Sequence, residues 1–180
     1  MLNFDTTTTF FSLLTLLAGG SAIALASLRV AAALGADRPW RAVAASVGPS
    51  ALPLAWLVAT TATLGSLYYS DYVGLVPCVL CWFQRIMMYP LVVLLGVAGL
   101  RRDSGIRVYV WPLVLIGATI AIGHYALEWA PAREGALCQA EAPCGVPSFR
   151  EFGFISLPFM ALSGFSLIGT LLLTIRPEDR

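Results

Sequence analysis

Five long apolar runs constrain the fold of this chain more than any other feature of its sequence. A helix that crosses roughly 30 Å of hydrocarbon at about 1.5 Å per residue needs about 20 predominantly apolar residues. Of the 180 residues, 58% are hydrophobic and only 12% are charged, which is typical of a membrane protein. We therefore predict an all-α integral membrane protein whose helices cover residues 10–34, 50–70, 83–100, 108–129 and 153–175.

The distribution of arginine predicts how these helices are oriented. Basic residues favour cytoplasmic connections, and most of them cluster in the first and third connections and after the last run: Arg29, Arg38, Arg41, Arg101, Arg102, Arg107, Arg176 and Arg180. Residues 1–9 carry Asp5 and no basic residue, so we expect the N-terminus outside and the C-terminus in the cytoplasm. All four cysteines then lie in external connections, at 70–82 and 130–152, where disulfides persist.

The first run could instead be read as a cleaved signal peptide, because residues 33–36 end it with small side chains. Two observations favour retention of the helix. No basic residue precedes the apolar run. Cleavage would also invert the next helix and carry Cys78 into the cytoplasm.

The cysteines fall into two pairs, Cys78/Cys81 and Cys138/Cys144, which suggests two redox couples in series. A four-thiolate zinc site is disfavoured, because five residues including Pro143 separate the second pair and the loops contain no histidine. Two inert structural disulfides are the other alternative. The spacing of the first pair closes too small a loop to constrain the unfolded chain much, whereas it suits a reactive couple at a helix N-terminus.

Polar residues near the first pair are further candidates for a site. Arg85 lies one turn beyond Cys81, and an arginine inside a span costs roughly 2.5–3.5 kcal/mol at the helix centre, so we expect it to have a role beyond extending to the headgroups. His124 is the only histidine. It can act as a proton donor or as a hydrogen-bonded packing residue, and Glu128 one turn later can pair with it or face water.

A specific resemblance follows from the order of these motifs. Two spans that enclose the second cysteine pair follow the run Cys78-Val79-Leu80-Cys81-Trp82-Phe83-Gln84-Arg85. This arrangement resembles the disulfide bond formation protein B (DsbB) family and its BdbC-like branch, and Phe152–Pro158 is similar to the start of that family's last span. The vitamin K epoxide reductase family has its two cysteine pairs in the reverse order. The resemblance implies a four-helix bundle over 50–175, with 10–34 as an extra N-terminal helix, in a single membrane domain of residues 1–180.

The resemblance also implies an activity and roles for the cysteines. Such proteins of the bacterial inner membrane reoxidise an extracytoplasmic DsbA-like thioredoxin-fold protein and pass its electrons to a membrane quinone, ubiquinone or menaquinone, without a metal. The partner thiolate is expected to attack Cys138. Cys144, once released, is expected to attack Cys78, so that Cys81 faces the quinone.

The remaining candidates would form the quinone site. We expect the Arg85 guanidinium to stabilise the Cys81 thiolate and to donate a hydrogen bond to a quinone carbonyl. Gln84 and Trp82 are expected to line the site, although Trp82 also suits the aromatic belt of the membrane interface. His124 would supply or relay a proton.

Two other functions remain open at this stage. The same relay could run in the reducing direction for a specialised partner, or the chain could be a non-enzymatic membrane scaffold with two structural disulfides. The net charge of +1 and the absence of a basic face argue against a nucleic-acid partner.

Overall fold

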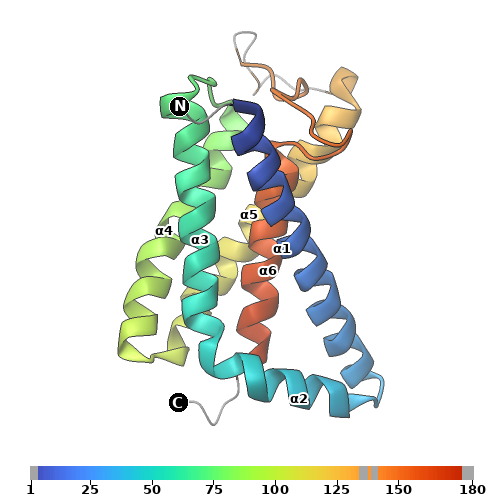
Figure 1. Cartoon of the computed structure of the whole chain (residues 1–180), viewed down its shortest axis with the longest axis vertical. Coiled ribbons are helices and arrows are strands. Elements are labelled where there is room, and N and C mark those ends of the chain that lie inside the picture. The colour runs from blue at the N-terminus through green and yellow to red at the C-terminus, as the bar shows by residue number, and fades with distance from the viewer. Residues whose placement is uncertain (1–3, 134–137, 139–141, 176–180) are drawn as a thin grey trace.

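The computed structural model describes residues 4–133, 138 and 142–175, and every regular element within them is helical. Five helices are long and apolar enough to cross a membrane, which confirms the predicted fold class. The six α-helices are α1 Phe4–Ala33, α2 Asp37–Val47, α3 Ala51–Leu67, α4 Val79–Arg101, α5 Arg107–Trp129 and α6 Leu157–Thr174. A π-helical turn, Tyr68–Tyr72, extends α3. Figure 1 shows α1, α3, α4, α5 and α6 running along the bundle and α2 crossing its foot.

The helices depart from the predicted runs at three boundaries. The first begins at Phe4 rather than at 10, because threonines in its first turns are buried against the bundle. The third span begins at Val79 rather than at 83, because Cys78 caps it. The last begins at Leu157 rather than at 153, because Phe152 and Gly153 have φ values of 49° and 79° that no α-helix contains.

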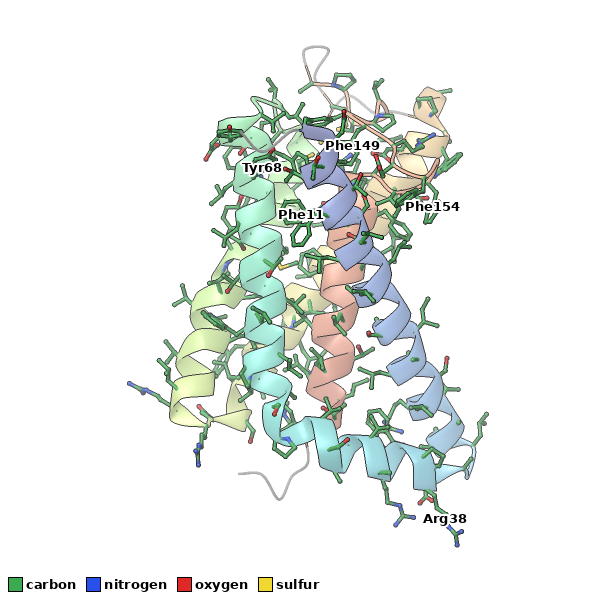
Figure 2. The ribbon with its side chains drawn as sticks, viewed as in Figure 1. Phe11, Arg38, Tyr68, Phe149 and Phe154 are labelled. Atoms are coloured by element: carbon green, nitrogen blue, oxygen red, sulfur yellow. A yellow bond between two sulfur atoms is a disulfide. The ribbon has the colours of Figure 1, made fainter. Side chains whose placement is uncertain are left out.

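The helix α2 is an element that the sequence analysis did not predict. It is amphipathic and lies across the foot of the bundle, with Arg38 pointing away from the other helices (Figure 2). Arg41 pairs with Asp37 on its exposed face, and Arg29 of α1 lies 5.8 Å from the ring centre of Trp40. An amphipathic basic helix in this position suits the membrane interface.

The centre of the bundle is α6, which packs against α1, α3 and α5. Its Phe165 is fully buried, and its ring lies so close to α5 that a Cβ at Gly117 would be 2.3 Å from the ring. Any larger residue there requires the ring to shift. The core around it consists of apolar side chains from four helices, including Ala55, Leu91, Leu95, Val110, Ile168 and Leu172.

The extra helix α1 is bound to the bundle by polar as well as apolar contacts. The hydroxyl of Tyr69 donates to Thr8 Oγ1 at 3.3 Å, and Thr9 donates to Glu151 at 3.0 Å. Phe11 packs against α3 near Tyr68, as Figure 2 shows, where a Cβ at Gly65 would be 3.0 Å from its ring. The N-terminal part of α1 is therefore an integral part of the bundle.

The two ends of the bundle differ in composition. The cysteine-bearing connections α3–α4 and α5–α6 gather at one end with the start of α1, whereas α2 and the α4–α5 connection lie at the other (Figure 1). Arg38, Arg41, Arg101 and Arg102 therefore lie at the end opposite to Cys78. Two arginines used to predict the orientation, Arg176 and Arg180, lie outside the described residues.

Candidate functional site

The first cysteine pair lies at the N-terminus of α4. Cys78 is the N-cap residue, and its Sγ accepts a hydrogen bond from the backbone N–H of Cys81 at 3.2 Å. The two sulfurs are 2.7 Å apart, compared with about 2.05 Å in a disulfide. Little movement therefore separates the dithiol from the disulfide, and the helix N-terminus favours a thiolate.

The second pair, Cys138 and Cys144, forms a disulfide in the connection between α5 and α6. The two cysteines differ in burial: Cys144 is 1% exposed, whereas Cys138 is partly exposed. A protein partner can reach the sulfur of Cys138 more readily than that of Cys144. The inner cysteine of this disulfide faces the interior of the protein.

The imidazole of His124 lies between the two cysteine pairs. Its Nε2 is 3.7 Å from Cys78 Sγ and 3.2 Å from the carbonyl oxygen of Cys144, and its Nδ1 is 3.0 Å from the amide nitrogen of Gln84. Because that amide nitrogen donates to Nδ1, a neutral imidazole carries its proton on Nε2, toward Cys78 and Cys144. His124 and Gln84 are 3% and 7% exposed. The fold thus gathers four predicted site residues from three segments of the chain.

The electrostatic setting of Cys78 differs from the sequence-based expectation, which placed the stabilised thiolate at Cys81. The hydrogen bond with the Cys81 side-chain thiol lowers the pKa of the Cys78 thiol, burial opposes this, and the contact with His124 lowers the pKa further. A stabilised Cys78 thiolate favours the dithiol over the disulfide. It therefore makes the Cys78/Cys81 disulfide a stronger oxidant.

Arg85 lies on α4, one turn beyond Cys81, and its guanidinium is bound to α3. Its Nε donates to Ser66 Oγ at 3.0 Å and its Nη2 to the Ser66 carbonyl oxygen at 3.1 Å. Tyr89 donates to the same Ser66 hydroxyl at 3.2 Å. These hydrogen bonds tie the guanidinium to the interior of the bundle, while its positive charge still acts favourably on a Cys81 thiolate.

A cavity of about 640 Å³ opens beside these residues, within the range of roughly 300–1,000 Å³ typical of small-molecule sites. Six polar lining residues lie at or beside the thiols: Cys78, Cys81, Gln84, Arg85, His124 and Glu128. Hydroxyl groups such as those of Thr15, Thr61 and Ser66 line it further away, and the rest is largely apolar and comes from α1, α3, α4, α6 and the two cysteine-bearing connections. Trp82 is not among the lining residues; its ring is 52% exposed and lies 5.3 Å from the Arg85 guanidinium carbon. The donors and the apolar walls fit a quinone, whose carbonyl oxygens accept hydrogen bonds.

From its sequence position, Glu128 could pair with His124 or face water. It is buried, and its side chain bonds Ser156. It accepts a hydrogen bond from Ser156, and Arg150 donates to its backbone carbonyl at 3.3 Å while stacking 4.2 Å over Trp129. It therefore does not face water. Sequence reasoning missed Ser66 and Ser156 altogether, because single serines in or beside apolar helices give no signal.

The fold also brings together three residues whose side chains can bind a metal ion. The ligand atoms of Cys78, Cys81 and His124 lie within 4.8 Å of one another, and thiolate and imidazole are zinc ligands. The four-cysteine zinc site considered from sequence is not the arrangement found, since Cys138 and Cys144 are bonded to each other.

A dithiol at the N-terminus of α4, a disulfide beside it and a cavity among apolar spans are the features of a membrane-embedded thiol–disulfide oxidoreductase. The comparisons with known proteins agree: the model of the family described as "Disulfide bond formation protein DsbB" matches residues 48–175. The chain belongs to this family. It is a multi-pass membrane protein with a role in disulfide bond formation.

Curated relatives carry related names. "Disulfide bond formation protein C" of Bacillus subtilis is 46% identical over 114 residues, which are 63% of this chain and 83% of the relative. "Probable disulfide formation protein C" of Bacillus cereus is 46% identical over 120 residues, 66% of this chain and 86% of the relative. "Probable disulfide formation protein" of Oceanobacillus iheyensis is 40% identical over 132 residues, 72% and 91%. No solved structure matches the chain significantly.

Proposed function

We propose that this protein oxidises a DsbA-like thioredoxin-fold partner outside the cytoplasmic membrane and passes the electrons to a membrane quinone. The observation that carries the proposal is the position of His124, which contacts both cysteine pairs at the edge of the cavity. In this proposal the cysteine end of the bundle is extracytoplasmic, with the N-terminus outside and the C-terminus in the cytoplasm. A reporter active only in the cytoplasm and fused before Phe4 should be inactive.

The partner side of the relay uses the exposed cysteine. A partner thiolate attacks Cys138 Sγ, the Cys138–Cys144 bond breaks, and Cys144 leaves as a thiolate. The second partner thiol then attacks its own mixed disulfide, so the partner leaves oxidised and the loop pair is left as a dithiol. Two electrons have moved to Cys138 and Cys144.

The inner exchange passes these two electrons to the first pair. Cys144 attacks Cys78, the Cys78–Cys81 bond breaks, and Cys81 leaves as a thiolate. Cys138 then attacks Cys144, which restores the loop disulfide and releases Cys78 as a thiolate. The backbone N–H of Cys81 and the His124 imidazole stabilise the Cys78 thiolate formed in this step.

The quinone side rests on the polar lining of the cavity. A bound quinone would accept the two electrons as the Cys78/Cys81 disulfide re-forms, together with two protons, equal in number to those that the two partner thiols lose. Arg85 and Gln84 supply N–H donors to a carbonyl oxygen, and His124 holds a proton on Nε2 beside Cys78. Arg85 reaches the quinone while Ser66 fixes the plane of its guanidinium, and the apolar walls exclude water.

The decisive experiment is anaerobic mixing of the fully reduced protein with a short-tailed ubiquinone or with menadione, followed by thiol counting and measurement of quinol. We expect about two thiols to be lost for each quinol formed. The matched control is the Cys78→Ser/Cys81→Ser protein, which should form no quinol. Equal oxidation of the control would refute the proposal, and absence of oxidation in both proteins would favour the scaffold with two structural disulfides.

A second mixture distinguishes the two directions of electron flow. Reduced partner with quinone should react to completion, whereas oxidised partner with quinol should not. The opposite outcome would establish the reducing relay.

A further inference from the structure

The helix α1 lies outside residues 48–175, which the family model matches, and yet it forms one wall of the redox cavity. Its lining residues include Phe11, Leu14, Thr15 and Ala18. These positions follow the spacing i, i+3, i+4, i+7, which places them on a single face of the helix. The feature that distinguishes this chain from its family's shared region therefore contacts the candidate substrate site.

The wall formed by α1 extends well below the thiols. From Phe11, beside Tyr69, to Ser21, the lining residues of α1 span eleven residues, or about 15 Å of helix at about 1.5 Å of rise per residue. The facing walls include the small residues Ala62 of α3 and Gly164 of α6. The cavity thus continues inward from Cys78 and Cys81 as a mainly apolar groove, with the hydroxyls of Thr15, Ser21 and Thr61 also on its walls.

We propose that α1, with α3 and α6, forms a groove that binds the isoprenoid tail of the quinone and so makes tail length a determinant of specificity. This inference rests on the proposed function. A ligand with hydrogen-bond acceptors at one end and a linear apolar chain at the other matches the polarity of the cavity. Because the tail arrives from lipid, its binding depends on van der Waals packing in the groove rather than on transfer from water. A lipid acyl chain in the groove is the competing occupant.

A matched pair of substitutions on α1 tests the groove. Ala18 lines the cavity, whereas Ala24 is exposed on the same helix and is not among its lining residues. In nanodiscs with a small dithiol as reductant, Ala18→Trp should raise the KM of a long-tailed ubiquinone about tenfold and leave that of a one-isoprene ubiquinone unchanged. Ala24→Trp should change neither. Should Ala18→Trp fail to fold, Ala18→Leu provides the same test with a smaller group.

A binding measurement complements the kinetics. A ubiquinone with a diazirine at the end of its tail should label residues 11–21 on irradiation, and unlabelled long-tailed ubiquinone should compete with the label. Ala18→Trp should abolish this labelling, whereas Ala24→Trp should retain it. Labelling of α1 that competing phospholipid removes but ubiquinone does not would assign the groove to a lipid chain.

The two proposals fail in different ways. If no quinone of any tail length oxidises the Cys78/Cys81 dithiol, the proposed function is wrong. If the short-tailed and long-tailed quinones respond equally to Ala18→Trp, quinone reduction stands and the tail groove is refuted.

Discussion

Replacing His124 should uncouple the two cysteine pairs, because its imidazole contacts both of them. In His124→Ala, the 3.7 Å contact with Cys78 Sγ and the 3.2 Å contact with the Cys144 carbonyl are lost. A hydrogen bond to a charged group contributes about 1.5–3 kcal/mol, which corresponds to roughly a tenfold to hundredfold change in rate. We expect the exchange between Cys144 and Cys78 to slow by this factor.

Two assays separate this effect from a general loss of activity. Turnover with a reduced DsbA-like partner requires exchange between the pairs, whereas a small dithiol reduces Cys78/Cys81 directly. His124→Ala should therefore lose much more activity with the protein partner than with the small dithiol. His124→Gln, which keeps an N–H donor, should recover part of the loss.

The pH dependence of alkylation provides an independent readout. Because His124 contributes to lowering the pKa of Cys78, its removal should raise the pH midpoint of Cys78 alkylation in the reduced protein, as resolved by mass spectrometry. Thr119→Val, at an exposed site on the same helix, should leave the midpoint unchanged. An unchanged midpoint in His124→Ala, together with equal losses in both turnover assays, would refute the assigned role.

Three further predictions concern the quinone site, the relay and the core. Arg85→Ala should raise the KM for a short-tailed quinone about tenfold or more, and Arg85→Lys should recover only part of it because lysine lacks the planar donor fork; steady-state kinetics that match wild type in both would contradict the role. Cys138→Ser should block turnover with the partner but not with a small dithiol, whereas Cys144→Ser leaves Cys138 as a free thiol that should form a partner-linked species with oxidised partner on non-reducing gels; normal turnover in either would reject the order of transfer. Gly117→Ala should lower the thermal unfolding temperature, since its Cβ would overlap the Phe165 ring and overpacking costs about 1–3 kcal/mol; an unchanged transition would show that the ring can move aside.

The sequence alone determined the membrane class, the five spans and the placement of both cysteine pairs in the connections between spans. These properties are local: about 20 apolar residues predict a span wherever they occur, and the spacing of Cys78 and Cys81 predicts a reactive pair at any helix start. Boundaries were less well predicted. The span expected from 153 begins at Leu157 because Phe152 and Gly153 have positive φ values, which an α-helix does not contain. The helix α2 was not predicted at all.

Only the tertiary structure decided which side chains meet. His124 is separated by 46 residues from Cys78, and Arg85 by 19 residues from Ser66, so no local pattern links them. The expected place of Trp82 in the quinone wall is not supported, and the α1 wall was not foreseen. The physical reason is that membrane helices are apolar on nearly all sides, so hydrophobic periodicity does not mark which face packs inward. That face is set by close packing, such as Phe165 on Gly117 and Phe11 on Gly65, which depends on the whole bundle.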